Sequence, residues 1–142
     1  MSLTDRKLMT FDVVGTLIDF ETGILDYIQA KAKQKGLQLT DQAILEAYAV
    51  AEDRQHHETP RLPFPSMMAP MYREMAAKLG LPDAPDDVEG FRLSIPRWPA
   101  FPDSAQALAA LVRARRGGVG GMLGSVALRG GIATVVIAAD GS

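Results

Sequence analysis

The pattern of apolar and polar positions divides the chain into a short strand, a series of helices and a glycine-rich end. The first apolar run, Leu8-Met9-Thr10-Phe11, ends at Asp12 and is followed by a Gly-Thr turn. A short apolar run bounded by turn residues predicts a buried strand that leads into a loop. A carboxylate at the end of such a run is unfavourable unless it is solvated or used. Asp12 is therefore the first candidate for chemistry.

Four segments between this strand and residue 98 have apolar residues at helical spacing, which predicts amphipathic helices. Gly36 and Gly80 suit helix C-termini, and Thr40 suits an N-cap. Three prolines make residues 56–66 a loop. The predicted helices cover residues 22–36, 40–56, 67–80 and 86–94.

Large apolar side chains in this region are expected to fill a core. Met67, Met71 and Met75 repeat at intervals of four residues, so they form one face of the third predicted helix. Trp98 lies between two prolines and is predicted to pack where the helical segment meets the rest of the chain. A further helix is predicted from an N-cap at Asp103 to about Arg115.

The last part of the chain has a different character. Residues 117–142 hold eight of the thirteen glycines, and glycine weakens regular structure by roughly 0.5–1 kcal/mol relative to alanine. The run IATVVIAAD could form a buried strand, but GGVGGMLGSVALRGG has no clear period. This segment is expected to be an atypical tail.

Composition narrows the function classes. The 142 residues fit one domain, and the absence of cysteine excludes disulfides, thiolate metal sites and cysteine nucleophiles. A net charge of -2 gives no reason to expect nucleic acid or an anionic membrane as a partner. No apolar stretch reaches the roughly 18 residues that span a bilayer. The N-terminus lacks the apolar core of a signal peptide, so a cytoplasmic location is expected.

The stretch MTFDVVGTLIDFE, with its strand, aspartate and Gly-Thr turn, resembles motif I of the haloacid dehalogenase (HAD) superfamily. The resemblance continues through a helical segment to FPDSAQALAALVRARR and implies an α/β fold, a partial HAD-like Rossmannoid core with an inserted α-helical bundle cap. The implied parts are a first core strand and nucleophile loop (1–19), the helical cap (20–98), a core re-entry helix (99–116) and the tail (117–142).

The resemblance also implies the chemistry. Asp12 would attack an electrophilic carbon or phosphorus to form an ester that water hydrolyses. Backbone N–H groups of Val13, Val14 and Thr16 would face the developing negative charge. Gly15 permits a tight turn, and Thr16 can hydrogen-bond locally to hold it. Phosphatases of the superfamily have a second aspartate at the place of Val14, so this chain is closer to the L-2-haloacid dehalogenases, whose halide leaves unprotonated.

The chain departs from the family pattern after the cap. No lysine follows Lys78, so the charge-balancing lysine of the family is missing. Ser125 lies roughly where a second motif with serine or threonine is expected, and Asp140 only superficially resembles the acidic motif. His56 and His57 are adjacent and more typical of a solvated loop than of a metal site. The resemblance implies neither a metal nor a cofactor.

The sequence thus predicts a dehalogenase-like hydrolase that acts on a small organic acid, with no nucleic acid or membrane partner and with a homodimer left open. Two alternatives remain: a catalytically inactive truncated or frameshifted fragment, and a helical interaction module. Because the lysine is missing, turnover of 2-haloacids is expected to be very slow or absent.

Overall fold

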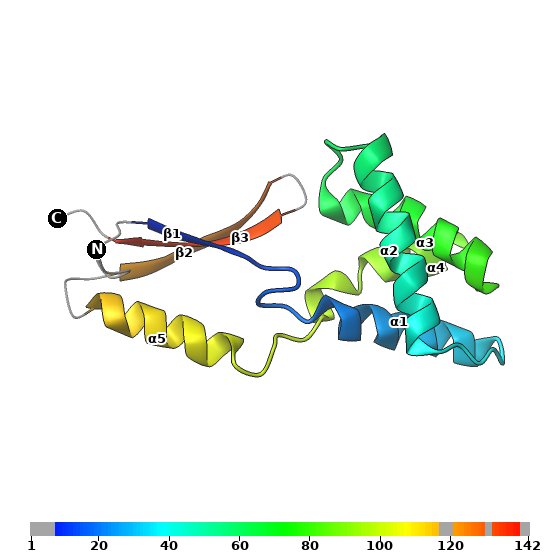
Figure 1. Ribbon diagram of the computed structural model, residues 1–142, viewed down its shortest axis with the longest axis horizontal. Helices are drawn as coiled ribbons and strands as arrows, with labels where there is room; N and C mark the ends of the chain where they lie inside the picture. Colours follow the sequence, from blue (N-terminus) through cyan, green and yellow to red (C-terminus); the bar gives the residue numbers. More distant parts are fainter. Residues whose placement is uncertain (1–7, 117–120, 130–131, 140–142) are drawn as a thin grey trace. The chain divides into compact units, whose positions relative to one another are not determined.

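The computed structural model describes residues 8–116, 121–129 and 132–139, and the chain forms two compact units (Figure 1). The sheet unit comprises Met1–Asp19 and Ala100–Ser142, and the helical unit comprises Phe20–Pro99. The helical unit covers the segment that the sequence predicts as a cap, and its role as a cap stays a prediction.

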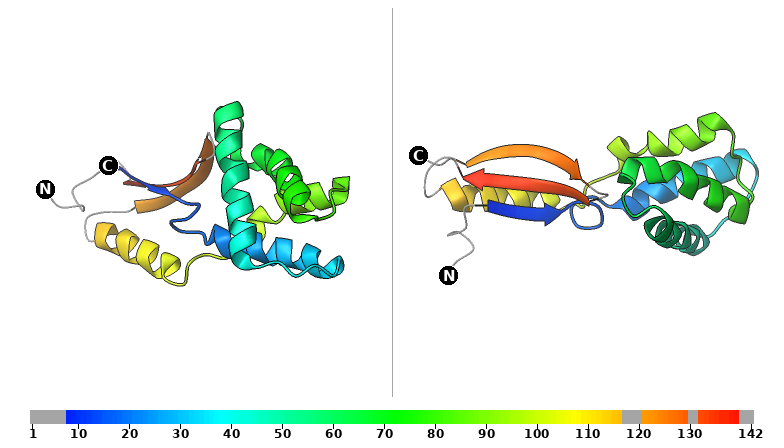
Figure 2. Two further views of the ribbon diagram at one scale, coloured as in Figure 1. Left: turned by 45° about the vertical axis from the view of Figure 1, so that its right-hand side comes forward. Right: turned by 90° about the horizontal axis from the view of Figure 1, so that it is seen from above.

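Among its described residues, the sheet unit contains the strands β1 (Leu8–Asp12), β2 (Gly121–Arg129) and β3 (Ile132–Ala139), and helix α5 (Ser104–Arg116) lies along one face of the sheet (Figure 2). The strand order is β1-β3-β2, and both neighbouring pairs are antiparallel. The register between β2 and β3 shifts between Gly124 and Ala127.

The α/β fold class with a partial Rossmannoid core is therefore wrong. The described chain is mostly helical, and its only sheet among the described residues is antiparallel. The short connection between β2 and β3 explains why these two strands pair antiparallel, because only Gly130 and Gly131 separate them. Parallel neighbours need a crossover of about a dozen residues or more, whereas two residues suffice for an antiparallel hairpin. The segment expected to be an atypical tail supplies two of the three strands.

The helical unit confirms the four predicted helices, with shifted ends. The N-cap hydroxyl of Thr40 accepts a hydrogen bond from the Ala43 N–H at 3.2 Å. Gly80 ends α3 in the left-handed conformation at φ 72°. The elements are α1 (Phe20–Gln34), α2 (Asp41–Glu58), α3 (Phe64–Leu79), α4 (Pro85–Arg92) and the short 3₁₀ helix η2 (Ile95–Arg97).

The loop predicted over 56–66 is too long. Helix α2 continues to Glu58, and α3 begins at Phe64 instead of residue 67. Pro65 lies in the first turn of α3, where its missing N–H would have no partner within the helix. Pro65 therefore marks the start of α3 and not a loop.

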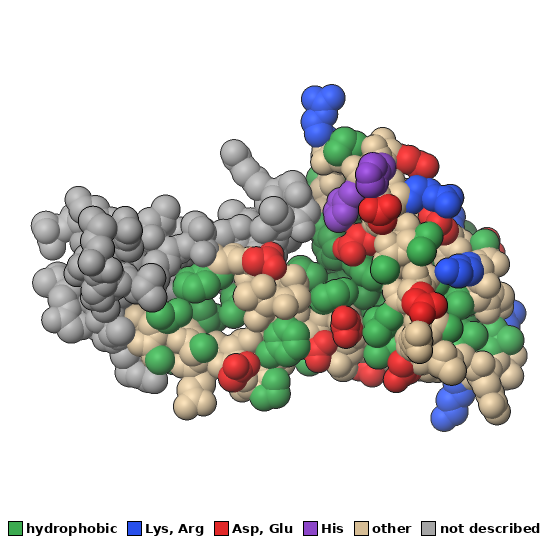
Figure 3. Space-filling model, in the orientation of Figure 1, with side chains coloured by type: hydrophobic (Ala, Val, Ile, Leu, Met, Phe, Trp, Pro, Cys, Tyr) green, Lys and Arg blue, Asp and Glu red, His purple; other side chains and the backbone are tan. Residues whose placement is uncertain are grey.

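The core of the helical unit contains methionines and aromatic rings beside buried isoleucines and alanines. Met67, Met71 and Met75 are almost fully buried, which confirms the predicted packing face. The ring of Phe91 contacts the rings of Tyr27 and Tyr72, with centroids 5.5 and 5.3 Å away. Charged side chains are scattered over the visible face of this unit (Figure 3). No helix in the described ranges is long and apolar enough to cross a membrane.

Candidate active site

Asp12 is the last residue of β1, and its side chain is exposed. Its partner across the sheet is Thr134 of β3, which also pairs with Ala127 of β2. Asp12 therefore lies at the carboxyl end of a strand, as the sequence predicts, but this strand is an antiparallel edge. The expectation that Asp12 points into the crevice at the carboxyl ends of parallel strands therefore has no basis in this sheet.

Thr16 holds the carboxylate of Asp12. The Thr16 hydroxyl donates a hydrogen bond to Asp12 Oδ2 at 3.0 Å, four residues back along the chain. Gly15 between them has φ 86°, a conformation that residues with a side chain rarely adopt. The turn therefore needs glycine, and it returns the Thr16 hydroxyl to the aspartate.

The loop after Asp12 is closed by its own backbone. The N–H groups of Thr16, Leu17 and Ile18 donate to the Val13 carbonyl oxygen at 3.3, 2.8 and 2.8 Å, and Gly15 N–H donates to Ile18 O at 2.9 Å. These bonds place Val14 and Ile18 side by side in a short parallel bridge. Of the three N–H groups expected to face substrate, that of Thr16 is used inside the loop.

A second segment braces this loop from far along the chain. Ser104, which is buried, donates its hydroxyl to the Leu17 carbonyl oxygen at 2.8 Å, and the Phe101 N–H donates to the same oxygen at 3.0 Å. Ile18 also pairs with Ala100. This role could not be predicted from the sequence, because a serine at the start of a helix is typical of a cap.

Removing the Ser104 hydroxyl should loosen the loop selectively. A net hydrogen bond stabilises a folded structure by about 1 kcal/mol, so Ser104→Ala should speed amide exchange over residues 15–18 about fivefold. Hydrogen exchange with mass spectrometry would measure this. Exchange in the helical unit should not change, and Ser66→Ala, an exposed serine in α3, serves as the control. Unchanged exchange in the loop of Ser104→Ala would show that the Phe101 bond alone holds Leu17.

Ser125 lies in β2, within the register shift between Gly124 and Ala127. Strand β3 separates β2 from β1, so the backbones at Ser125 and Asp12 lie on strands about 10 Å apart. The two strands run in the same direction, since each is antiparallel to β3. A role for Ser125 in binding substrate stays a prediction. Asp140 lies outside the described residues.

The charge-balancing lysine of the family that the chain resembles has no counterpart in the later part of the sequence. No lysine follows Lys78 in the sequence. Lys31, one of the lysines of the helical unit, is paired within that unit, with its Nζ 2.5 Å from Asp87 Oδ1. This hydrogen bond raises the pKa of Lys31, although partial burial opposes the rise. Lys31 is thus engaged in holding α1 to α4.

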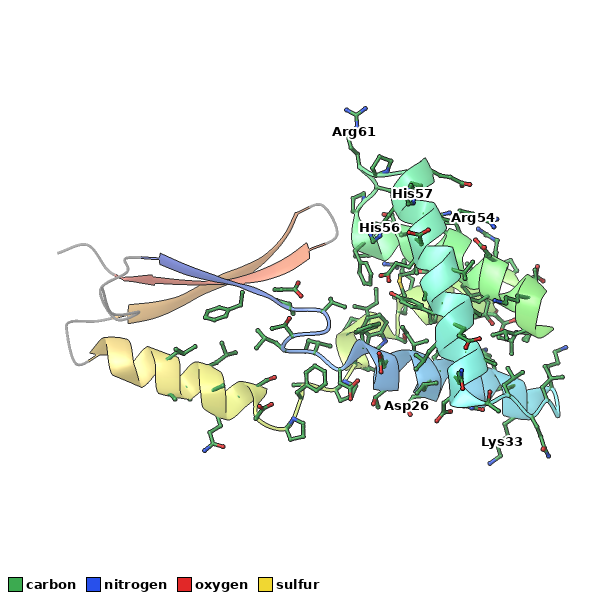
Figure 4. All side chains as sticks on the ribbon, in the orientation of Figure 1. Asp26, Lys33, Arg54, His56, His57 and Arg61 are labelled. Atoms are coloured by element: carbon green, nitrogen blue, oxygen red, sulfur yellow. The ribbon has the colours of Figure 1, made fainter. Side chains whose placement is uncertain are left out.

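His56 and His57 lie in the last turn of α2 and not in the loop that the sequence predicts. His57 Nδ1 lies 2.8 Å from the Asp53 carbonyl oxygen, and the side chains of both residues are exposed near the end of α2 (Figure 4). Among the residues that the structure describes, no three His, Asp or Glu side chains are grouped closely enough to hold a metal ion.

Comparison with known proteins finds no match, either among family models or among curated proteins. The likeness to the HAD superfamily therefore rests on the residues around Asp12 and on the order of the segments that follow.

Proposed function

We propose that this chain is a dehalogenase-like hydrolase in which Asp12 is the nucleophile. The observation that carries the proposal is the hydrogen bond from the Thr16 hydroxyl to Asp12 Oδ2 at the exposed end of β1. An exposed aspartate needs no such partner to be stable, whereas a nucleophile benefits from a fixed orientation. The proposal concerns the chemistry of Asp12 and does not require a parallel sheet.

The reaction has two steps. Thr16 binds Oδ2, so Oδ1 attacks the carbon that carries the halogen. The new carbon–oxygen bond forms as the carbon–halogen bond breaks, and halide leaves with the electron pair. The product of this step is an ester between Asp12 and the organic acid.

Water completes the reaction at the carbonyl carbon of that ester. The bond between this carbon and the ester oxygen breaks, the departing oxygen takes one proton from water, and a second proton is released. A 2-hydroxy acid leaves with an oxygen atom that belonged to Asp12, and the oxygen of water remains in the carboxylate. The net reaction converts a 2-haloacid and water into a 2-hydroxy acid, halide and a proton.

Val14 favours halide over an alkoxide as the leaving group. It is two residues after Asp12, and its apolar, half-buried side chain cannot donate a proton. An alkoxide needs a proton to leave, whereas halide does not. The substrate class that fits this site is therefore a small halogenated organic acid.

Turnover is expected to be slow. The carboxylates of Asp12 and of a 2-haloacid repel each other by roughly 4 kcal/mol at 4 Å and an effective dielectric near 20, which corresponds to about a thousandfold in rate if nothing offsets it. Purified chain should release halide slowly, and Asp12→Asn should release none. Thr16→Val, which keeps the shape of the side chain, should lower the rate by about tenfold or more.

Isotope transfer distinguishes the ester mechanism from direct attack by water. In a single turnover in water labelled with heavy oxygen, the label should enter the peptide that contains Asp12 and not the product. Label in the first product would contradict the proposal. Absence of both halide release and an ester on Asp12 would favour the inactive fragment instead.

A further inference from the structure

A pocket of about 250 Å³ opens on the helical unit, whereas Asp12 and Thr16 belong to the sheet unit. It lies between one face of α1 and the segment around η2. Its volume is just below the range of about 300–1,000 Å³ typical of ligand pockets, so it would take a small molecule. The lining residues are Gly23, Asp26, Tyr27, Ala30, Ser94, Arg97 and Trp98.

The aromatic walls of this pocket are held in place. The Tyr27 hydroxyl donates to the Asp87 carbonyl oxygen at 2.6 Å. Trp98 Nε1 donates to Ser94 Oγ at 3.1 Å, and Ser94 Oγ donates to the Phe91 carbonyl oxygen at 2.7 Å. The polar atoms of these walls are therefore satisfied within the protein, and the part of each ring that faces the pocket is apolar, although Trp98 is only 6% exposed.

Two opposite charges stand at the rim without pairing. Asp26 and Arg97 are both exposed and both line the pocket. Within the described part of the chain, neither side chain makes a hydrogen bond or an ion pair. Asp26 lies on α1 (Figure 4), and Arg97 ends η2, where Pro96 and Pro99 restrict the backbone on either side. An apolar slot flanked by one cation and one anion matches a zwitterion.

We propose that this pocket binds a small amino acid with an apolar side chain. The guanidinium of Arg97 would bind the carboxylate, Asp26 would bind the ammonium group, and the side chain would lie between Tyr27 and Trp98. Ala30, a small and exposed residue of α1, also lines the pocket. The proposal does not depend on the chemistry of Asp12.

Trp98 is the only tryptophan of the chain, so it reports binding directly. Its fluorescence emission and the resonance of its indole N–H should both change on titration of the purified full chain with L-leucine, with a Kd on the order of 1 mM. Isocaproate lacks the ammonium group and isoamylamine lacks the carboxylate. Each should bind at least about tenfold more weakly than leucine, because one charged hydrogen bond is lost.

Matched variants test the two charges. Arg97→Gln and Asp26→Asn should each weaken leucine binding by about tenfold or more. Lys33→Gln removes the same charge from an exposed position on α1 that does not line the pocket, so it should leave the Kd unchanged (Figure 4). Ala30→Leu should abolish binding by filling the pocket. Circular dichroism would verify that each variant is folded.

Three results would contradict this assignment of the pocket. No change in either Trp98 signal up to the solubility limit of leucine would overturn the proposal. Equal affinity for leucine and isocaproate would overturn the role of Asp26 and with it the zwitterion. Unchanged affinity in Arg97→Gln would place the leucine elsewhere.

Discussion

Gly23→Ala should destabilise the helical unit, although the same substitution stabilises most helices. Gly23 is buried in α1, and an added Cβ would lie 2.2 Å from Cδ1 and 2.3 Å from Cγ of Trp98. Replacing glycine by alanine inside a helix ordinarily raises the free energy of unfolding by about 1 kcal/mol, whereas overfilling a packed site lowers it by about 1–3 kcal/mol. The indole cannot retreat easily, because its Nε1 is bonded to Ser94 and its ring lies edge-on to Phe64 with centroids 6.2 Å apart. The clash should therefore exceed the gain.

Urea denaturation followed by far-ultraviolet circular dichroism would measure the change in the free energy of unfolding. The decisive comparison is a double-mutant cycle with Trp98→Ala. In that background the clash is absent, so Gly23→Ala should be neutral or stabilising by up to about 1 kcal/mol. Stabilisation by Gly23→Ala in the presence of Trp98 would show that the indole moves without loss and that the close contact is not a constraint.

The helices of the helical unit were predictable because their signals are local. Thr40 marks a helix start because its hydroxyl accepts a hydrogen bond from the Ala43 N–H, and Gly80 marks a helix end because glycine adopts the left-handed conformation freely. The stripe from Met67 to Met75 marks a buried face by spacing alone. The ends of α2 and α3 were less predictable, since a proline breaks a helix interior but is accommodated in a first turn.

The sheet was not predictable in the same way. Strand β2 carries Gly121 and Gly124 and has a register shift, so it lacks the alternation that identifies a strand. The pairing of β1 with β3 joins residues more than a hundred positions apart. The resemblance around Asp12 suggested a parallel sheet, and nothing in the strand sequences themselves distinguishes the two directions. The two-residue gap between β2 and β3 does indicate an antiparallel pair, but this gap can be recognised only once both strands are known.

In the candidate site, too, local contacts could be predicted and long-range contacts could not. The contact between Asp12 and Thr16 spans four residues and follows from a turn at Gly15, so a local hydrogen bond from Thr16 could be predicted. The bond from Ser104 to Leu17 spans 87 positions and required the fold. The pocket lined by Tyr27 and Trp98 was likewise invisible, because aromatic residues in helices are usually core.

Alkaline unfolding should be steep, because all three tyrosines of the chain are neutral hydrogen-bond donors in the helical unit. Tyr48 donates to Glu52 Oε1 at 3.1 Å, Tyr72 to the Pro82 carbonyl oxygen at 2.8 Å, and Tyr27 to the Asp87 carbonyl oxygen at 2.6 Å. Burial raises the pKa of each phenol above the ordinary value of 10.0. Nearby carboxylates raise the pKa values further, whereas Lys31 partly offsets the rise for Tyr27.

These raised pKa values determine how the free energy of unfolding changes with pH. Below pH 10.0 both states keep the phenol protons, so the tyrosines do not change stability with pH. Above it the unfolded chain loses its protons first, and the free energy of unfolding falls by about 1.4 kcal/mol per pH unit for each tyrosine still protonated in the folded state. Tyr48 and Tyr72, whose side chains are almost fully buried, should together give about 3 kcal/mol per pH unit. Lys31 acts in the same direction, because Asp87 raises its pKa above 10.5 and stability is lost as pH rises through that higher pKa.

Tyrosinate absorbance and circular dichroism, recorded together from about pH 9 to about pH 12, would measure this transition. Tyr48 and Tyr72 are almost fully buried, so most of the tyrosinate signal should change over the same pH interval as the circular dichroism. Tyr48→Phe should reduce the alkaline slope by about 1.4 kcal/mol per pH unit. Glu52→Gln, which keeps the phenol but removes the neighbouring charge, should leave most of that slope in place. A tyrosinate signal that rises near pH 10 while the circular dichroism stays constant would mean that these phenols reach water in the folded protein, and the packing around Tyr48 and Tyr72 would then be looser than the structure has it.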